Sequence, residues 1–540
     1  MKLNAESLKN KSIWEQMGIT LPQFDHAAMM QNTANRPAWL HFGAGNIFRG
    51  YIARLQQELL NTAAVDTGIV VAETFDFDII DRIYAPHDSL AMLVTLNHDG
   101  TTQKEIIASM AASYRSDTGI NELSDVFSNP SLQMVSFTIT EKGYSLHDIN
   151  GDLLSIVASD IKNGPSEAKH AMSLVAALML TRFKADAYPI SLVSMDNCSH
   201  NGDRLKNAVL TISKAWTENG YAPLEFVTYI EDAAKVAFPW SMIDKITPRP
   251  AEAVEKLLSG VGIEGMPPIV TSKNTFIAPF VNAEAAEYLV IEDAFPNGRP
   301  PLEHAGVYFT DRETVNKVET MKVTTCLNPL HTALAVFGCL LGYESIAEEM
   351  KDDDLVALVK KIGYDEGMKV VVDPGIINPR DFIDEVIERR LPNPFIPDTP
   401  QRIATDTSQK VGIRFGQTIK AYHSDNILAV ENLEGIPLAI AAWMRYLLAV
   451  DDNHNPIELS PDPMHSVLLP KLSSIVPGKP ESYNGQLESI LSNDALFGVD
   501  LYAVNLGKKI EDYFVQMLAG PGAVRTTLAH RKETECFKQH

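Results

Sequence analysis

The chain is 540 residues long and carries a net charge of -23 at pH 7; this length exceeds one ordinary hydrophobic core, so we expect two domains. The acidity repels phosphate backbones and anionic lipid surfaces, which argues against nucleic acid or a membrane as the partner and leaves a small molecule, bound by a monomer or a small homo-oligomer. There are four cysteines, Cys198, Cys326, Cys339 and Cys536, and none forms a CxxC pair, so the sequence shows no metal-ligand motif. So few cysteines, together with a polar N-terminus that lacks the apolar core of a signal peptide, predict a cytoplasmic protein.

The first predicted elements are a strand, a glycine turn and a helix, which follow a polar lead-in segment at 1–36. A short apolar run at 38–42 ends at Gly43-Ala44-Gly45, and apolar residues recur at helical spacing over 46–60. Further strands are predicted at 68–72, 134–139 and 190–194. Strands that alternate with helices in this way indicate the α/β class, with a parallel, doubly wound sheet.

Helical patterns dominate beyond residue 285. After a strand-like run at 288–291, they cover 329–342, 350–361, 381–390, 433–450 and 505–519. We therefore expect a Rossmann-like dinucleotide-binding domain at 1–285 and a mainly helical substrate and catalytic domain at 286–540, with the active site in the cleft between them. The most apolar stretch, 436–450, contains Arg445 and is too short to span a bilayer, which favours a buried or subunit-contact helix.

The glycine turn is a candidate dinucleotide site. Gly43 and Gly45 are the first two glycines of a GxGxxG pattern, which lets backbone N–H groups approach a pyrophosphate at a helix N-terminus. The candidate cofactor-binding residues at this turn and at the start of the helix are Gly43, Gly45, Asn46, Phe48 and Arg49. The alternative is a turn that serves only the fold, in an α/β protein with another ligand.

An acidic residue at the end of the second strand strengthens this prediction. Glu73 could bind the adenosine ribose hydroxyls, and Asp76 is the second choice. Because a carboxylate repels a 2′-phosphate, Glu73 favours NAD as the cofactor, with NADP as the alternative. Either acid could instead be a solvated loop residue.

Six segments, in this order along the chain, resemble one protein family. They are HFGAGNIFRG at 41–50, TITEKGY at 138–144, SMDNCSHNG at 194–202, FPWSMIDKITP at 238–248, YLVIEDAFPNGRPPLEHAGV at 288–307 and MKVTTCLNPLH at 321–331. Their number and order are similar to those of the polyol-specific long-chain dehydrogenases, the mannitol dehydrogenase family, and most of all to its fructuronate (D-mannonate) reductase members. The resemblance runs from about residue 37 to the last helices.

The resemblance implies an NAD(P)-dependent oxidoreductase that interconverts a secondary alcohol and a ketone without a metal. A lysine acts as general acid–base on the reacting oxygen, asparagine amides stabilise the charge on that oxygen, and a histidine orients the substrate. Mapped by motif, the catalytic residues are Lys322, Asn328, His331 and Asn197. The residues that resemble substrate-binding positions are Asp244, Arg390 and Lys410.

The segment that carries Lys322 departs from the family pattern. Five residues separate Lys322 from Asn328 where the family has four. One extra residue turns a helical side chain by about 100°, so a bulge must absorb it, or Lys322 points elsewhere and Lys317 or Lys410 becomes the candidate. Pro329 follows Asn328, and Asn-Pro is also typical of a helix N-cap followed by a first-turn proline.

The substrate class is predicted from charge. On this acidic chain, a local cluster of cations at Arg389, Arg390, Arg402 and Lys410 favours an anionic sugar acid, of the D-mannonate/D-fructuronate or the tagaturonate type. Alternatively, these cations pair with Glu388, Asp398 and Asp406, and the protein is a neutral polyol dehydrogenase such as mannitol 2-dehydrogenase. A candidate of another class is a non-catalytic nucleotide-sensing protein on the same fold, with Lys322 displaced.

Overall fold

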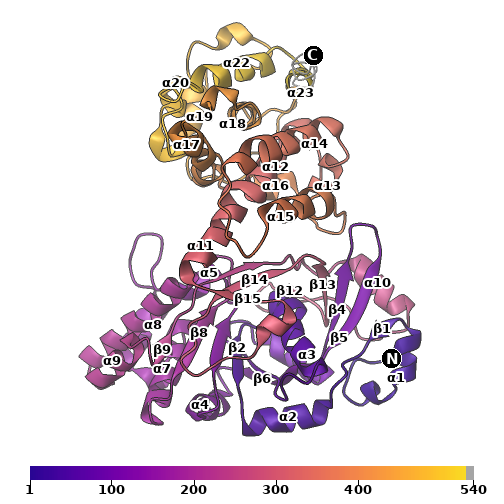
Figure 1. Ribbon diagram of the computed structural model, residues 1–540, viewed down its shortest axis with the longest axis vertical. Coiled ribbons are helices and arrows are strands. Elements are labelled where there is room, and N and C mark those ends of the chain that lie inside the picture. Colours follow the sequence, from indigo (N-terminus) through magenta and orange to yellow (C-terminus); the bar gives the residue numbers. More distant parts are fainter. Residues whose placement is uncertain (531–540) are drawn as a thin grey trace. The chain divides into compact units, whose positions relative to one another are not determined.

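The computed structural model describes residues 1–530, so Cys536 lies outside the described residues. The chain divides into two compact units, of which the first ends at Asn316 and the second begins at Lys317 (Figure 1). This division lies beyond the expected residue 285, because strand β14 (Tyr288–Glu292) pairs with β10 (Ser241–Asp244) and with β15 (Tyr308–Thr310). These pairings keep the chain in the first unit after residue 285.

The first unit contains a six-stranded parallel sheet in the order β6-β3-β2-β7-β8-β9. Its strands are β2 (Trp39–Phe42), β3 (Ile69–Glu73), β6 (Met110–Arg115), β7 (Met134–Phe137), β8 (Ile190–Ser194) and β9 (Val236–Ala237). Counted along the chain, this is the doubly wound order 3-2-1-4-5-6, which reverses direction between β2 and β7. The predicted α/β class and parallel sheet are confirmed.

Side chains alternate between the two faces of this sheet, and helices cover both faces. Leu40 and Phe42 of β2 belong to one hydrophobic core, whereas Trp39 belongs to the other. The first core is completed by α4 (Ile120–Ser128), α7 (Ala171–Lys184) and α8 (Asn201–Glu218), and the second by α3 (Ala53–Asn61). Because both faces are buried, the strands read as nearly continuous apolar runs in the sequence.

Three smaller sheets complete the first unit. They are β1 (Ile19–Thr20), β5 (Thr102–Ile107), β4 (Ala91–Leu96) and β13 (Phe280–Glu284) in that order, then β10-β14-β15, and the hairpin of β11 (Ile269–Val270) and β12 (Phe276–Ile277). Strand β13 returns late in the chain to pair in parallel with β4. A strand that follows the large sheet in the sequence therefore pairs with one that lies between β3 and β6, which the sequence patterns did not indicate.

The second unit is helical within the described residues. Its main helices are α12 (Asn328–Leu341), α14 (Asp353–Lys360), α15 (Pro379–Glu385), α17 (Gln417–Ser424), α18 (Gly435–Tyr446), α22 (Gly507–Met517) and α23 (Ala523–Ala529). The mainly helical second half is confirmed: α12, α14, α15, α18 and α22 lie within or close to the predicted helical segments, whereas α17 and α23 were not predicted. Every residue of α18 is buried, which agrees with the prediction that the most apolar stretch forms a buried helix.

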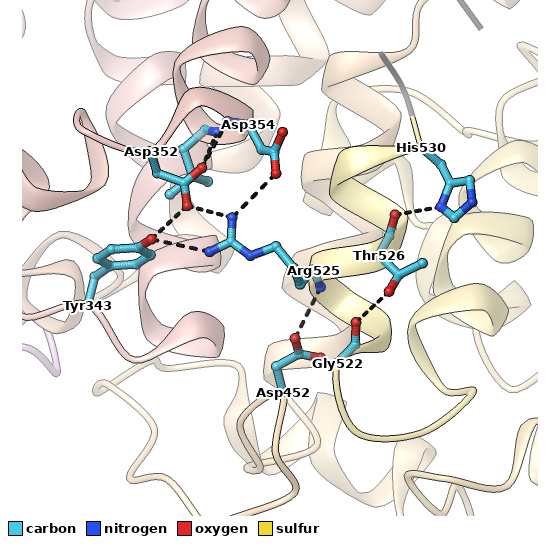
Figure 2. Close-up of polar contacts among 9 residues, drawn as sticks. Tyr343, Asp352, Asp354, Asp452, Gly522, Arg525, Thr526 and His530 are labelled. Carbon is cyan, nitrogen blue, oxygen red and sulfur yellow. Dashed lines mark hydrogen bonds and ion pairs between the residues drawn. The ribbon is translucent and has the colours of Figure 1, made fainter. Parts of the chain in front are cut away.

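The last described helix, α23, is held by charge and by hydrogen bonds (Figure 2). The Arg525 guanidinium lies 2.5 Å from the Asp352 carboxylate and 3.6 Å from that of Asp354, and it donates to the Tyr343 hydroxyl at 3.2 Å. Asp452 accepts hydrogen bonds from the backbone N–H groups of Val524 and Arg525. These contacts attach α23 to the beginning of α14 and to the segments that follow α12 and α18.

One helical run, Arg312–Leu341, is long and apolar enough to cross a membrane by length and composition alone. It comprises α11 (Arg312–Met321), a short π-helix and α12. Of its most apolar window, 78% is buried inside the protein. Such burial is typical of a core helix.

Candidate functional site

The glycine turn lies where the parallel sheet reverses direction. The N–H of Gly43 donates to the Ala72 carbonyl at the end of β3. Gly43 has φ +106°, and a Cβ there would lie 2.2 Å from the carbonyl oxygen of Thr138, which follows β7. Only glycine can adopt this conformation at so close an approach. Gly43 therefore joins the carboxyl ends of β2, β3 and β7, where open α/β sheets bind their ligands.

Gly45 differs from Gly43 in its surroundings. A Cβ on Gly45 would meet no protein atom within 4 Å. The next helix begins at Asn46 and continues through the π-helix η2 (Phe48–Ile52) into α3. A turn with space above its second glycine, followed at once by a helix N-terminus, fits the pyrophosphate of a dinucleotide.

Replacing Gly45 with valine should therefore weaken NADH binding roughly tenfold or more, because the added side chain would occupy the approach to the pyrophosphate. Thermal stability should stay nearly unchanged, because no protein atom is displaced. Gly43→Val is the contrasting variant and should fail to fold stably. Fluorescence titration with NADH, together with thermal unfolding, separates the two glycines. An unchanged dissociation constant for Gly45→Val would contradict the assignment.

The side chains of Phe48 and Arg49 form the base of the turn. Phe48 is fully buried and stacks on His41, with 4.2 Å between ring centroids. Arg49 donates to the Ala278 carbonyl at 2.7 Å and to Asn46 Oδ1 at 2.8 Å. Burial lowers the pKa of Arg49 to about 10, within a range where the guanidinium remains charged at neutral pH. Because the Phe48 and Arg49 side chains are buried, we expect Asn46, Phe48 and Arg49 to act on a cofactor through their backbone N–H groups and through the positive charge of Arg49.

Glu73 fastens the turn to the end of β3. One of its carboxylate oxygens accepts from the N–H of Ala44 at 2.9 Å, and the other accepts from the N–H groups of Thr74, Phe75 and Asp76. Each carboxylate oxygen offers about two acceptor positions, and three of the four bonds here go to one oxygen, so the oxygen that binds Ala44 keeps acceptor capacity. Binding of ribose hydroxyls by Glu73 stays a prediction, and the contacts in place show that Glu73 shapes the loop after β3.

Asp196 joins the loops that follow β7 and β8. Its carboxylate accepts from the N–H groups of Ile139 and Thr140, both at 2.9 Å, and from the Tyr144 hydroxyl at 2.6 Å. Burial raises the pKa of Asp196, and these hydrogen bonds oppose the shift. Asn197, the predicted catalytic amide, is the next residue and is exposed. Asp196 and Tyr144 thus fix the loop that presents Asn197, a role that the motif alone did not reveal.

The segment that contains Asp244 is attached to the same region. The Asn201 side chain donates to the carbonyls of Ser194 and Ser241 and accepts from the Ser241 N–H. A Cβ on Gly202 would lie 2.5 Å from the Phe238 carbonyl oxygen. Asp244 ends β10 and is buried. The segments SMDNCSHNG and FPWSMIDKITP are therefore in direct contact.

Lys322 begins a π-helix, η7 (Lys322–Cys326), between α11 and α12. A π-helix accommodates one extra residue within an otherwise α-helical run. This π-helix is the bulge that one of the two predicted alternatives requires, and the direction of Lys322 toward the reacting oxygen stays a prediction. The Lys322 residue is only 3% exposed.

Asn328 and His331 lie three residues apart on one face of α12. Asn328 is the first residue of the helix, and the N-cap position belongs to Leu327; the predicted alternative of an Asn N-cap is therefore wrong. His331 Nε2 lies 3.3 Å from the Asp398 carboxylate, which also binds Arg402. Burial acts to raise the pKa of Asp398, but His331 and Arg402 lower it overall. Asp398 therefore stays ionised and orients His331.

The predicted basic residues of the second unit differ in their surroundings. Arg390 ends the π-helix η10 (Val386–Arg390) and is buried, whereas its neighbour Arg389 is exposed. Lys410 donates to the Thr405 carbonyl, and burial together with Arg414 lowers its pKa. Of the acids predicted as alternative partners, Asp398 indeed pairs with Arg402.

Arg414 is a functional candidate that the sequence patterns missed. Its guanidinium donates to the Thr332 hydroxyl at 2.6 Å, and Thr332 follows His331 in α12. Burial lowers the pKa of Arg414 to about 10. Within residues 1–530, no carboxylate forms an ion pair with it. The only indication in the sequence was that Arg414 follows Lys410 by four residues in a helical segment.

The structure therefore brings the predicted residues together in two sets. Gly43, Gly45, Glu73 and Asn197 gather at the carboxyl end of the parallel sheet in the first unit. In the second unit, Arg414 binds Thr332, the residue after His331, and lies close enough to Lys410 to lower its pKa. An active site in a cleft between the units stays a prediction.

Two cavities are lined by other residues. One of about 520 Å³ is lined by residues that include Lys142, Tyr144 and Arg204, and one of about 470 Å³ by residues that include Gly522 and His530. Neither is lined by a predicted site residue. Within the described part of the chain, no three His, Cys, Asp or Glu side chains gather in a way that could hold a metal ion.

The chain is similar to known proteins over most of its length. Residues 37–304 match the mannitol dehydrogenase Rossmann domain, and residues 314–517 match the mannitol dehydrogenase C-terminal domain. The chain is 54% identical to the D-mannonate oxidoreductase of Thermotoga maritima over 98% of both chains. It is 28% identical to the mannitol 2-dehydrogenase of Cereibacter sphaeroides, over 82% of this chain and 86% of that protein. The solved ternary complex of Pseudomonas fluorescens mannitol 2-dehydrogenase with NAD and D-mannitol has 26% identity and a TM-score of 0.70, and covers 99% of this chain and 100% of that chain.

Proposed function

Because the chain belongs to the mannitol dehydrogenase family, we propose that it is an NAD-dependent oxidoreductase of sugar acids, which interconverts D-fructuronate and D-mannonate or the corresponding tagaturonate pair. The observation that carries this proposal is the 54% identity to a D-mannonate oxidoreductase over 98% of both chains. The strand order 3-2-1-4-5-6 and the glycine turn at its reversal support dinucleotide binding. The proposal includes a cytoplasmic location.

The bound cofactor supplies or accepts the hydride, and the protein manages the proton and the orientation. In the oxidation of the alcohol, neutral Lys322 removes the hydroxyl proton; in the reduction of the ketone, the Lys322 ammonium returns it. Asn197 and Asn328 donate hydrogen bonds to the reacting oxygen, and such donors are worth several kcal/mol in a site that excludes water. The Lys322 residue is only 3% exposed, so bulk water has little access to the proton that it transfers.

The basic residues of the second unit bind the substrate carboxylate. A guanidinium without a carboxylate partner favours an anionic ligand, because burying an unpaired charge is unfavourable. Arg414 meets this description, and Lys410 lies close enough for its pKa to respond to Arg414. His331, oriented by Asp398, is next to Thr332, to which Arg414 donates. Arg414 and Lys410 therefore bind the carboxylate, while His331 binds the sugar hydroxyls.

We expect the purified protein to reduce fructuronate or tagaturonate with NADH at a kcat/KM at least about tenfold above that for fructose, because only the uronates carry the carboxylate. Arg414→Ala should lower kcat/KM for the uronate by about 10²-fold and for fructose much less. Arg389→Ala, which removes an exposed arginine of the same unit, is the matched control and should leave both values unchanged.

A preference for fructose over both uronates would reverse the proposal in favour of a neutral polyol dehydrogenase. The similarity to a mannitol 2-dehydrogenase over 82% of the chain makes this the second candidate. Equal losses with both substrates in Arg414→Ala would show that Arg414 supports the fold and does not recognise the carboxylate.

A further inference from the structure

The loop after β3 presents an aromatic ring to solvent. Phe75 has an exposed fraction of 64%, whereas Phe276 on the nearby hairpin has 36%. The backbone on both sides of Phe75 is held by hydrogen bonds. The N–H groups of Thr74, Phe75 and Asp76 all donate to one oxygen of Glu73, whose other oxygen accepts from Ala44 in the glycine turn. Glu73 thus fixes the Phe75 backbone relative to the glycine turn.

A second loop is fastened to this one. The Thr271 hydroxyl donates to Asp76 Oδ2 at 2.6 Å, and the Ser272 N–H donates to Asp78 at 2.7 Å. Both residues lie in the turn between β11 and β12. The turn brings the Lys273 ammonium to 5.0 Å from the centroid of the Phe75 ring. An ammonium at this distance attracts the ring face and orients it.

The position of Phe75 suggests its ligand. In a sheet of this topology, the pyrophosphate lies at the glycine turn and the adenosine extends toward the end of the next strand. Phe75 follows the end of that strand by two residues. An exposed, oriented aromatic ring is a stacking surface for a base, and base–aromatic stacking is a strong interaction that needs no hydrogen bond.

We propose that Phe75 is the surface on which the adenine ring of the dinucleotide stacks. Lys273 holds the Phe75 ring on one side, and Glu73 holds its backbone, so that the ring is in place before the cofactor binds. The proposal rests on the proposed function in one respect, since it presupposes that the chain binds a dinucleotide. It adds a residue of this chain for the adenosine end, which the motif for the pyrophosphate does not include.

The test uses three probes on the full-length protein in binding titrations without substrate. They are NADH, 5′-AMP, which is the adenosine half of NADH with one phosphate, and reduced nicotinamide mononucleotide, which is the other half and lacks the adenosine. Phe75→Ala should raise the dissociation constants for NADH and 5′-AMP about tenfold and leave that for the mononucleotide unchanged. Phe75→Trp should keep the wild-type affinities, because its ring also stacks. Phe276→Ala removes a less exposed phenylalanine on the hairpin that carries Lys273, and it should change none of the three dissociation constants.

Two results would overturn the proposal. One is an unchanged affinity of Phe75→Ala for 5′-AMP, and the other is an equal loss of affinity for the mononucleotide. These readings do not depend on turnover. If no sugar acid is reduced but 5′-AMP binding falls in Phe75→Ala, the proposed function fails and the role of Phe75 stands. If uronates are reduced and 5′-AMP binding is unchanged in Phe75→Ala, the proposed function stands and the role of Phe75 fails.

Discussion

Lys322→Ala should lower kcat by about 10³-fold, because general acid–base catalysis by a positioned side chain contributes about 10²–10⁴-fold. The dissociation constant for NADH should stay within about twofold, since the predicted cofactor contacts lie at the glycine turn. Stopped-flow measurement of a single turnover, together with NADH titration, distinguishes the two effects. Lys317→Ala is the matched control, because it removes a lysine of the same helical run and should keep near-normal turnover.

The geometry of η7 gives this prediction its physical basis. An extra residue in a regular α-helix would turn Lys322 by about 100° relative to Asn328 and His331. A π-helix can take up one extra residue by widening one turn, and η7 runs from Lys322 to Cys326, just before Asn328. Near-normal kcat in Lys322→Ala would mean that the bulge does not restore this alignment. Lys317 or Lys410 would then be the proton-transfer residue.

The fold was predictable where periodicity and turn chemistry act locally. The runs at 38–42 and 68–72 and the glycines between strand and helix identified β2, β3 and their turn. What the sequence patterns missed depends on residues far along the chain. Gly43 is required because of the Thr138 carbonyl, 95 positions later, whereas Gly45 has no such neighbour. The division between the two compact units lies beyond the expected residue 285 for the same reason, since β14 pairs with β10, which precedes it in the sequence.

The candidate site shows the same limit. A motif can name Asn197 and His331, but it cannot show that Asp196 and Asp398 hold the loop and the ring beside them. Arg414 belongs to no recognised motif, and only its burial without an ion pair distinguishes it from a surface arginine. Residues that position others are found from contacts, because their chemistry is directed at the protein and not at the ligand.

Glu366→Gln should destabilise the second unit by about 3 kcal/mol, since each buried donor left unsatisfied costs about 1–3 kcal/mol. Glu366 is 2% exposed and accepts from the N–H groups of Glu434, Gly435 and Ile436, at 2.7, 2.7 and 2.9 Å. These groups begin the buried helix α18. In glutamine, an NH₂ group replaces one of the two carboxylate oxygens. This donor would face backbone N–H groups, which are also donors, and only one acceptor oxygen would remain. Thermal unfolding should shift down by roughly 10 °C, and an unchanged midpoint would show that water satisfies the helix terminus.

Glu349→Gln is the contrasting isosteric variant, and its effect should have the opposite sign. Glu349 is fully buried against Gly338 of α12, and within residues 1–530 neither of its carboxylate oxygens has a hydrogen-bond partner. Burial, and then the nearby charge of Asp352, raise its pKa well above the usual range. The folded state therefore binds a proton that the unfolded state releases, and the stability contributed by Glu349 is lost as the pH rises from about 4.5 through the folded-state pKa. Glutamine does not titrate, so Glu349→Gln should match the wild type near pH 4 and become more stable than it as the pH rises. A constant difference between the two unfolding free energies across this range would mean that the Glu349 carboxyl has found a partner in solution.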